Sequence, residues 1–138
     1  MQLMPATARW TAKKTGTPFT QDMITDRDMN LKLGMSYLKL VLDDLGGSQA
    51  MAAAAYNAGP GRPRRWREGP RLEPAIWVEN VPFSETRDYV KKVLSNATFY
   101  SALLNNPNAT QAPSLKARLG RTIGPREAGQ PAPDAELP

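Results

Sequence analysis

The 138-residue chain contains neither cysteine nor histidine. Without cysteine it has no disulfide and no thiolate nucleophile, and without histidine it lacks the commonest metal ligand and general base. Zinc sites and Ser-His or Cys-His catalytic triads are therefore excluded. Any acid–base chemistry falls to Glu, Asp, Tyr or Lys side chains. We expect no metal and no cofactor.

Aromatic residues and long apolar runs are also scarce. Aromatic residues make up only 7% of the chain, and no window approaches the roughly 18 consecutive apolar residues of a membrane span. The N-terminus has no basic segment followed by an apolar one, so the chain as written carries no signal peptide. The length and the 41% share of hydrophobic residues predict one domain with a modest core.

Basic residues exceed acidic ones, and the net charge is +5. This charge favours encounters with anionic polymers such as nucleic acid, anionic lipid or a cell wall that carries peptide carboxylates. Five arginines gather around Trp66, at positions Arg62, Arg64, Arg65, Arg67 and Arg71. They would suit peptide carboxylates, or nucleic-acid phosphates with Trp66 stacked on a base. Such a run is more often a solvated basic loop.

The first part of the chain has helical apolar spacing and almost no strand signal. Pro5 suits a first helical position, and Gly16 ends the helix that begins there. Residues 17–25 are expected to form a loop. Asp26 is a suitable N-cap for a long helix whose three-and-four apolar spacing ends at Gly46-Gly47.

Three further helical segments follow. Ser48 can cap a helix whose run from Ala50 to Ala55 has no polar face, so this run should be buried on all sides. A short helical turn is expected at residues 62–67, and a proline-broken loop at 68–81. Ser84 then caps a helix that ends near residue 105. Its apolar stripe consists of Tyr89, Val93, Leu94, Ala97, Tyr100 and Leu104.

The composition changes at Pro107. Six of the remaining thirty-two residues are proline, none is aromatic, and the apolar positions follow no period. These features predict a disordered tail. The expected organisation is therefore a folded domain over residues 1–106 and a disordered proline-rich tail over 107–138.

Three motifs carry the functional signal. They are Met1-Gln2-Leu3-Met4-Pro5, then Ala55-Tyr56-Asn57-Ala58-Gly59, and finally Pro82-Phe83-Ser84-Glu85-Thr86-Arg87 followed by Tyr89-Val90. In this order and separation they resemble the catalytic domain of the soluble lytic transglycosylases, which cut peptidoglycan. The resemblance covers roughly residues 1–105. It implies an all-α domain of the goose-type-lysozyme-like fold.

The resemblance also implies which side chains bind substrate. It places Gln2 and Met4 in the lining of a glycan cleft, Glu85 against a sugar, and the Tyr56 hydroxyl near the catalytic carboxyl, with Asn57 in the same motif. Each residue has a plainer interpretation. Gln2 and Met4 would be surface and core filler, Tyr56 a half-buried core aromatic, Asn57 a helix-end residue, and Glu85 a partner of the helix dipole.

In the family, the catalytic glutamate precedes the first motif, on a helix that this chain does not contain. One carboxylic acid with a raised pKa protonates the glycosidic oxygen between N-acetylmuramic acid and N-acetylglucosamine, and the muramyl C6 hydroxyl then closes a 1,6-anhydro ring. An ordinary glycosidase needs two carboxyls. Glu85 and the weaker candidate Glu79 cannot replace the missing acid, because both belong to the opposite part of the motif set.

We therefore expect a lysozyme-like domain that lacks its first helices, with Met1 as an internal methionine of a longer gene. The chain as written should be inactive, with Tyr56 as a supporting residue. The resemblance implies peptidoglycan glycan strands as the partner, no nucleic acid, a monomer, and a periplasmic or cell-envelope location for the full-length protein.

Three alternatives stay open. A non-catalytic glycan-binding remnant would keep Gln2, Met4, Tyr56 and Glu85. A basic helical nucleic-acid binder would use the arginine run, although no named motif supports it. A goose-type lysozyme that hydrolyses the same bond is a variant of the first interpretation, and only analysis of the product separates the two.

Overall fold

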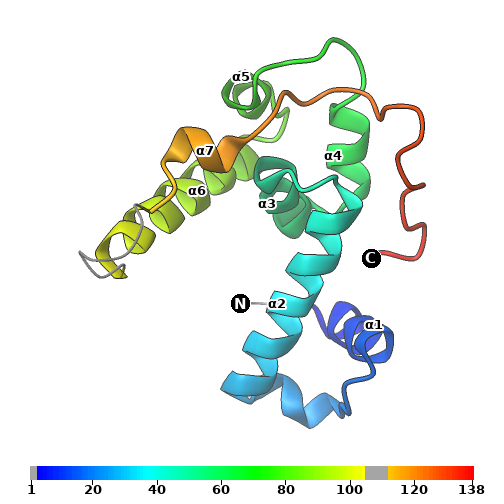
Figure 1. Cartoon of the computed structure of the whole chain (residues 1–138). Coiled ribbons are helices and arrows are strands. Elements are labelled where there is room, and N and C mark those ends of the chain that lie inside the picture. Colours follow the sequence, from blue (N-terminus) through cyan, green and yellow to red (C-terminus); the bar gives the residue numbers. More distant parts are fainter. Residues whose placement is uncertain (1–2, 105–111) are drawn as a thin grey trace.

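The computed structural model describes residues 3–104 and 112–138 (Figure 1). Within these ranges the chain is helical and contains no β-strand. The elements are α1 (Pro5–Thr15), the 3₁₀-helix η1 (Gln21–Thr25), α2 (Arg27–Asp44), α3 (Gln49–Ala58), α4 (Gly61–Trp66), α5 (Pro74–Glu79), α6 (Ser84–Leu104) and α7 (Leu115–Leu119). No described helix is long and apolar enough to span a bilayer. The all-α prediction is confirmed.

The ends of the first two α-helices follow the predicted capping residues. Gly16 ends α1 at a φ of 65°, a left-handed conformation that favours glycine, and its N–H bonds to carbonyls of the last turn. The Asp26 side chain accepts a hydrogen bond of 2.7 Å from the Met29 N–H and so caps α2. Both helices were therefore predicted with nearly the observed bounds.

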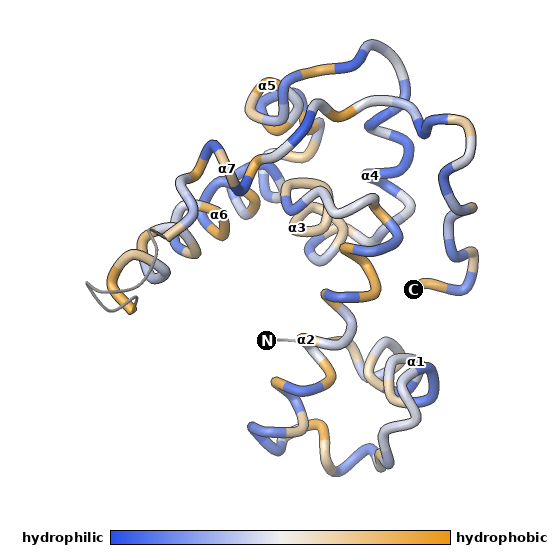
Figure 2. The backbone as a smooth tube through the Cα atoms, viewed as in Figure 1, coloured by the Kyte–Doolittle hydropathy of each residue, from blue (hydrophilic) through white to orange (hydrophobic). Residues whose placement is uncertain are grey.

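Helix α3 is the centre of the fold. The run from Ala50 to Ala55 is buried throughout, and no residue in it is more than 6% exposed. The helix contacts α2, α4, α6 and α7, and Figure 2 shows its apolar course in the middle of the molecule. Because alanine side chains are short, neighbouring helices approach it closely. The prediction that this run has no solvent-facing side is confirmed.

Two hydrophobic clusters pack against different parts of α2. The main cluster surrounds α3 and includes Tyr37 and Val41 of α2. The small cluster is formed by Ala8, Ala12 and Leu33, with partly buried apolar residues of η1 and its flanks around it. Helix α1 packs mainly against α2 and η1. The described chain therefore has two packed regions joined along one helix.

Two segments expected to be loops contain short helices. Residues 17–25 include η1, and residues 68–81 include α5, which begins at Pro74. A proline fits the first turn of a helix because its missing N–H has no intrahelical partner there. Trp77 and Val78 then lie buried in the main cluster. The loop prediction took Pro74 as a breaker, whereas it starts a helix.

The predicted apolar stripe of α6 is correct only for its first half. Leu94 is buried, and Tyr89 and Val93 are partly buried against the main cluster, but Tyr100 is 58% and Leu104 is 83% exposed. Val90, which the predicted stripe omits, is fully buried. Phe99 and Leu103 are also largely exposed, at 61% and 64%, so the apolar residues of the last turns of α6 face away from the core.

The prediction of a disordered tail is wrong for residues 112–138. Leu72 and Ile123 form an isolated antiparallel bridge with two backbone hydrogen bonds of 2.8 Å. Ile123 and Leu137 are only 4% and 7% exposed and belong to the main cluster. Two well-placed apolar side chains anchor this segment, and prolines lower the conformational entropy that it loses on ordering. The predicted boundary at 106/107 lies outside the described residues.

Replacing Ile123 with alanine tests the docking of this segment. We expect Ile123→Ala to lower the free energy of unfolding by about 2 kcal/mol or more, because a buried isoleucine leaves a cavity. The exposed neighbour gives a matched control, and Thr122→Ala should stay within about 0.5 kcal/mol of the wild type. Urea denaturation measures both. Equal stability of the two variants would contradict the docked arrangement.

Candidate functional site

The second motif lies in the last turn of α3. Tyr56 and Asn57 are the final polar residues of this helix, and Gly59 follows at a φ of 82°, which a side chain would strain. The Gly59 N–H donates to the Ala55 carbonyl at 2.7 Å. The turn that follows leads directly into α4. A tightly held helix end therefore presents two polar side chains side by side.

Tyr56 has a buried hydroxyl without a hydrogen-bond partner among the described residues. Its ring lies against the Tyr37 ring, with the centroids 5.7 Å apart. Burial raises the pKa of Tyr56 to about 12, and the nearby Tyr89 and Tyr37 phenols add to the rise. The phenol is therefore neutral near pH 7 and able to donate. Since an unpaired buried hydroxyl is unfavourable by about 1–3 kcal/mol, this one is suited to a ligand or an added polar group.

Asn57 joins the second motif to the third. The Thr86 hydroxyl donates to the Asn57 side-chain oxygen at 2.7 Å, and Thr86 is only 2% exposed. This bond fixes the end of α3 against the first turn of α6. Thr86 was not among the site residues predicted from the sequence, although it stands inside the third motif. Its role is to hold two helix ends together.

Glu85 is exposed in the first turn of α6, next to Thr86. No ion pair with another described residue holds its carboxylate. Glu79 differs, because its Oε1 lies 2.6 Å from Lys91 Nζ. Glu79 is therefore an ion-paired surface charge, while Glu85 stays available to a ligand.

The first motif lies at the start of α1, and the structure describes it from Leu3 onward. Met4 is 72% exposed at the N-cap position of α1, and Leu3 packs against both clusters. Gln2 lies outside the described residues. The structure therefore joins Tyr56, Asn57 and the start of α6 directly. Among the described residues, Met4 forms no hydrogen bond or ion pair with this group.

The arginine run is divided among separate contacts. Arg64 forms a largely buried ion pair with Asp44 at 2.6 Å, and Arg71 lies 3.2 Å from Glu127. The Arg62 guanidinium stacks over Phe83 at 4.8 Å from the ring centroid. This arrangement is not the continuous basic patch that a nucleic-acid backbone needs.

A cavity of about 340 Å³ lies at the other end of α3 from Tyr56. Ser48 and Met51 line it together with residues 119–125 and the side chains of Arg67 and Arg71. No residue of the three motifs takes part. The cavity is therefore separate from the candidate site.

The raised pKa of Tyr56 gives a testable pH dependence. A folded-state pKa of about 12 against an ordinary value of 10.0 favours the protonated phenol. The corresponding stability is complete below about pH 10 and is lost as the pH rises towards 12. We expect Tyr56→Phe to flatten the fall in melting temperature above about pH 10, measured by circular dichroism. The exposed Tyr100 gives the control, and Tyr100→Phe should behave like the wild type.

Comparison with known proteins identifies the family. The transglycosylase SLT domain matches residues 1–75, and the soluble lytic transglycosylase helical domain matches residues 80–108. The soluble lytic murein transglycosylase of Salmonella typhimurium is 38% identical over 118 residues, which are 83% of this chain and 18% of that protein. The Escherichia coli K12 protein of the same name is 41% identical over 104 residues, 72% of this chain and 16% of that protein. The chain thus spans less than a fifth of these relatives.

Solved structures agree with the fold. An inactive glutamate-to-glutamine mutant of lytic transglycosylase Slt from Pseudomonas aeruginosa has a TM-score of 0.79 at 40% identity and covers 90% of this chain and 20% of that one. The 70-kDa soluble lytic transglycosylase of Escherichia coli has a TM-score of 0.76 at 35% identity, with 89% and 20% covered. Its complex with bulgecin A has a TM-score of 0.70. The predicted lysozyme-like helical fold is thereby confirmed.

The family match, the sequence identities and the shared fold all indicate the same family. The match to the SLT domain alone covers more than half of the 138 residues. The motif residues Tyr56, Asn57 and Thr86 lie together at one end of the buried α3. The chain belongs to the lytic transglycosylase SLT domain family, whose members degrade peptidoglycan.

Proposed function

We propose that this chain is the glycan-binding part of a lytic transglycosylase domain that cleaves the β-1,4 bond between N-acetylmuramic acid and N-acetylglucosamine. The observation that carries the proposal is the buried, unpartnered hydroxyl of Tyr56, next to an Asn57 that is fixed by Thr86. Such a hydroxyl would be paired by a sugar group or by a catalytic carboxyl. The proposed partner is a peptidoglycan strand, bound by a monomer.

The proposed reaction needs one carboxylic acid. The acid gives its proton to the glycosidic oxygen as the bond from that oxygen to C1 breaks. The resulting carboxylate then takes the proton of the muramyl C6 hydroxyl, whose oxygen bonds to C1 and closes the 1,6-anhydro ring. No water is consumed, and the acid is restored. The inactive glutamate-to-glutamine mutant among the related structures supports the importance of a single glutamate in that relative.

The residues of this chain have supporting roles in the proposal. The Tyr56 phenol stays neutral because of its raised pKa, and it donates to a carboxyl oxygen or to the substrate. The Glu85 carboxylate accepts hydrogen bonds from sugar hydroxyl or amide groups. Met4, and Gln2 before it, line the cleft. None of these side chains is a general acid in the proposal, so the chain as given should bind glycan without cleaving it.

We place the full-length protein in the periplasm or cell envelope, where peptidoglycan is found. The arginine run does not support nucleic acid as a competing partner. Arg64 and Arg71 are engaged by carboxylates, and Trp66 lies edge-on against Phe83 with the centroids 5.3 Å apart.

Glycan binding by the purified chain tests the proposal. We expect Glu85→Gln to weaken the binding of a chitooligosaccharide about tenfold, because a hydrogen bond to a charged group contributes about 1.5–3 kcal/mol. Asp88→Asn is the matched control, since Asp88 is an exposed acid one turn further along α6, and its affinity should equal that of the wild type. Titration calorimetry measures both. Equal affinities of the two variants would remove Glu85 from the site.

Analysis of the reaction products tests the proposal that none of the side chains in this chain is the catalytic acid. Incubation of the chain with purified sacculi should release no anhydromuropeptides. Fusion to the segment that precedes the matched region in the Escherichia coli relative should produce them, and a glutamate-to-glutamine change in that segment should stop the release. Chromatography with mass spectrometry distinguishes anhydro from reducing ends. Release by the chain alone would contradict the proposal, and reducing ends from the fusion would indicate a hydrolase.

A further inference from the structure

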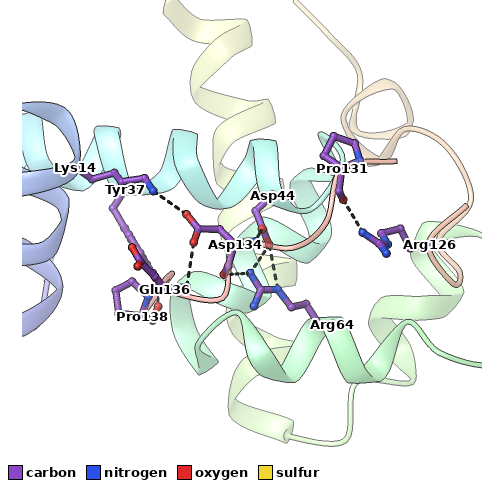
Figure 3. Close-up of polar contacts among 9 residues, drawn as sticks. All are labelled: Lys14, Tyr37, Asp44, Arg64, Arg126, Pro131, Asp134, Glu136 and Pro138. Carbon is purple, nitrogen blue, oxygen red and sulfur yellow. Dashed lines mark hydrogen bonds and ion pairs between the residues drawn. The ribbon is translucent and has the colours of Figure 1, made fainter. Parts of the chain in front are cut away.

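Residues 134–138 form a strap across three helices (Figure 3). Asp134 is its first anchor. Its carboxylate lies 3.2 Å from Lys14 Nζ of α1, its N–H donates to Asp44 of α2 at 2.6 Å, and its carbonyl accepts from Arg64 of α4 at 2.9 Å. One residue of the C-terminal segment therefore contacts three separate elements.

The charges around Asp134 are matched. Arg64 donates through both Nε and Nη2 to one oxygen of Asp44, which leaves the other Asp44 oxygen for the strap N–H. The N–H of Glu136 and the Lys14 ammonium lower the pKa of Asp134. Each carboxylate oxygen of the anchor therefore has a partner that favours its ionised form.

The other end of the strap reaches the candidate site. Leu137 is 7% exposed and belongs to the main cluster. The Tyr37 hydroxyl donates to the Pro138 main-chain oxygen at 2.5 Å, and Figure 3 shows these two residues beside Asp134. The ring of Tyr37 in turn lies against the ring of Tyr56. A continuous chain of contacts thus runs from the strap to the unpartnered phenol.

The strap also connects α1 with α4. Helix α1, which carries Met4 at its start, packs mainly against α2 and η1. Lys14 on α1 and Arg64 on α4 are both bound by Asp134. The distance between the part of the chain that holds Met4 and the part that holds Tyr56 therefore depends on this segment as well as on α2.

We propose that the strap is a positioning element of the glycan site, and that Tyr37 is the positioning residue through which it orients Tyr56. The inference rests on the proposed function. Tyr37 does not itself contact substrate in this proposal. Its hydroxyl is held by Pro138, so its ring has one fixed angle, and the ring of Tyr56 packs against that fixed surface.

A double-mutant cycle separates positioning from general stability. Tyr37→Phe keeps the ring and removes only the bond to Pro138. We expect it to weaken chitooligosaccharide binding about three- to tenfold in the wild-type background and to have no effect in the Tyr56→Phe background. Titration calorimetry gives the four affinities. Equal weakening in both backgrounds, or none in either, would overturn the role of Tyr37.

A second measurement needs no glycan. Leu137→Ala removes the buried anchor of the strap, and Glu136→Ala changes the exposed neighbour as a control. In ¹³C-tyrosine NMR, with the signal assigned by its loss in Tyr56→Phe, the Tyr56 titration midpoint should fall towards 10 in Leu137→Ala and stay near 12 in the control. An unchanged midpoint would overturn the strap as a positioning element.

The two measurements also separate the inference from the proposed function. A wild-type chain that binds no glycan refutes the proposed function, while the Tyr56 midpoints still decide whether the strap sets the surroundings of that phenol. A wild type that binds, with Tyr56→Phe weakened and Tyr37→Phe unchanged, leaves the proposed function intact and refutes the inference.

Discussion

The close packing around α3 is the constraint on which the rest depends. A helix of short side chains, buried from Ala50 to Ala55, lets α2, α4 and α6 approach its backbone. Because interiors are packed to crystal-like density, a larger residue in this run would push away the helix that it faces. The polar end of α3 is held by the same packing. Tyr56 and Asn57 gain fixed positions because the helix that carries them has no room to move.

The site is assembled from helix ends. The Asn57–Thr86 bond closes the end of α3 onto the start of α6, and Glu85 follows from its place beside Thr86 in the first turn. Both helix ends are fixed by packing, since Thr86 is only 2% exposed and the Tyr56 hydroxyl is buried. Among Tyr56, Asn57, Glu85 and Thr86, the Tyr56 hydroxyl is the buried polar atom that has no hydrogen-bond partner in the described part of the chain. An unsatisfied group in such a rigid frame indicates where a ligand or a further carboxyl belongs.

Local signals explain what the sequence could predict. The caps Gly16, Asp26 and Ser48 act through neighbouring backbone groups, so α1, α2 and α3 followed from their residues. The ordered structure of the C-terminal segment could not be predicted from local signals, because it depends on the bridge between Ile123 and Leu72, about fifty residues apart. Composition describes the average tendency of a segment, and one buried isoleucine changes the average little. The motifs predicted Tyr56 and Glu85 as site residues, whereas Tyr37 stands in none of them.

Tyr37 shows how a core position can also serve a site. It is 4% exposed, it belongs to the main cluster, and its hydroxyl still finds an acceptor in Pro138. A phenylalanine would fill the same space, so packing alone does not explain the hydroxyl. The acceptor comes from a segment that also binds Lys14 of α1 and Arg64 of α4. The hydroxyl therefore couples the orientation of the Tyr37 ring to the arrangement of the helices around the candidate site. Hydrophobic contact does not supply such a coupling, because hydrophobic interactions are not directional.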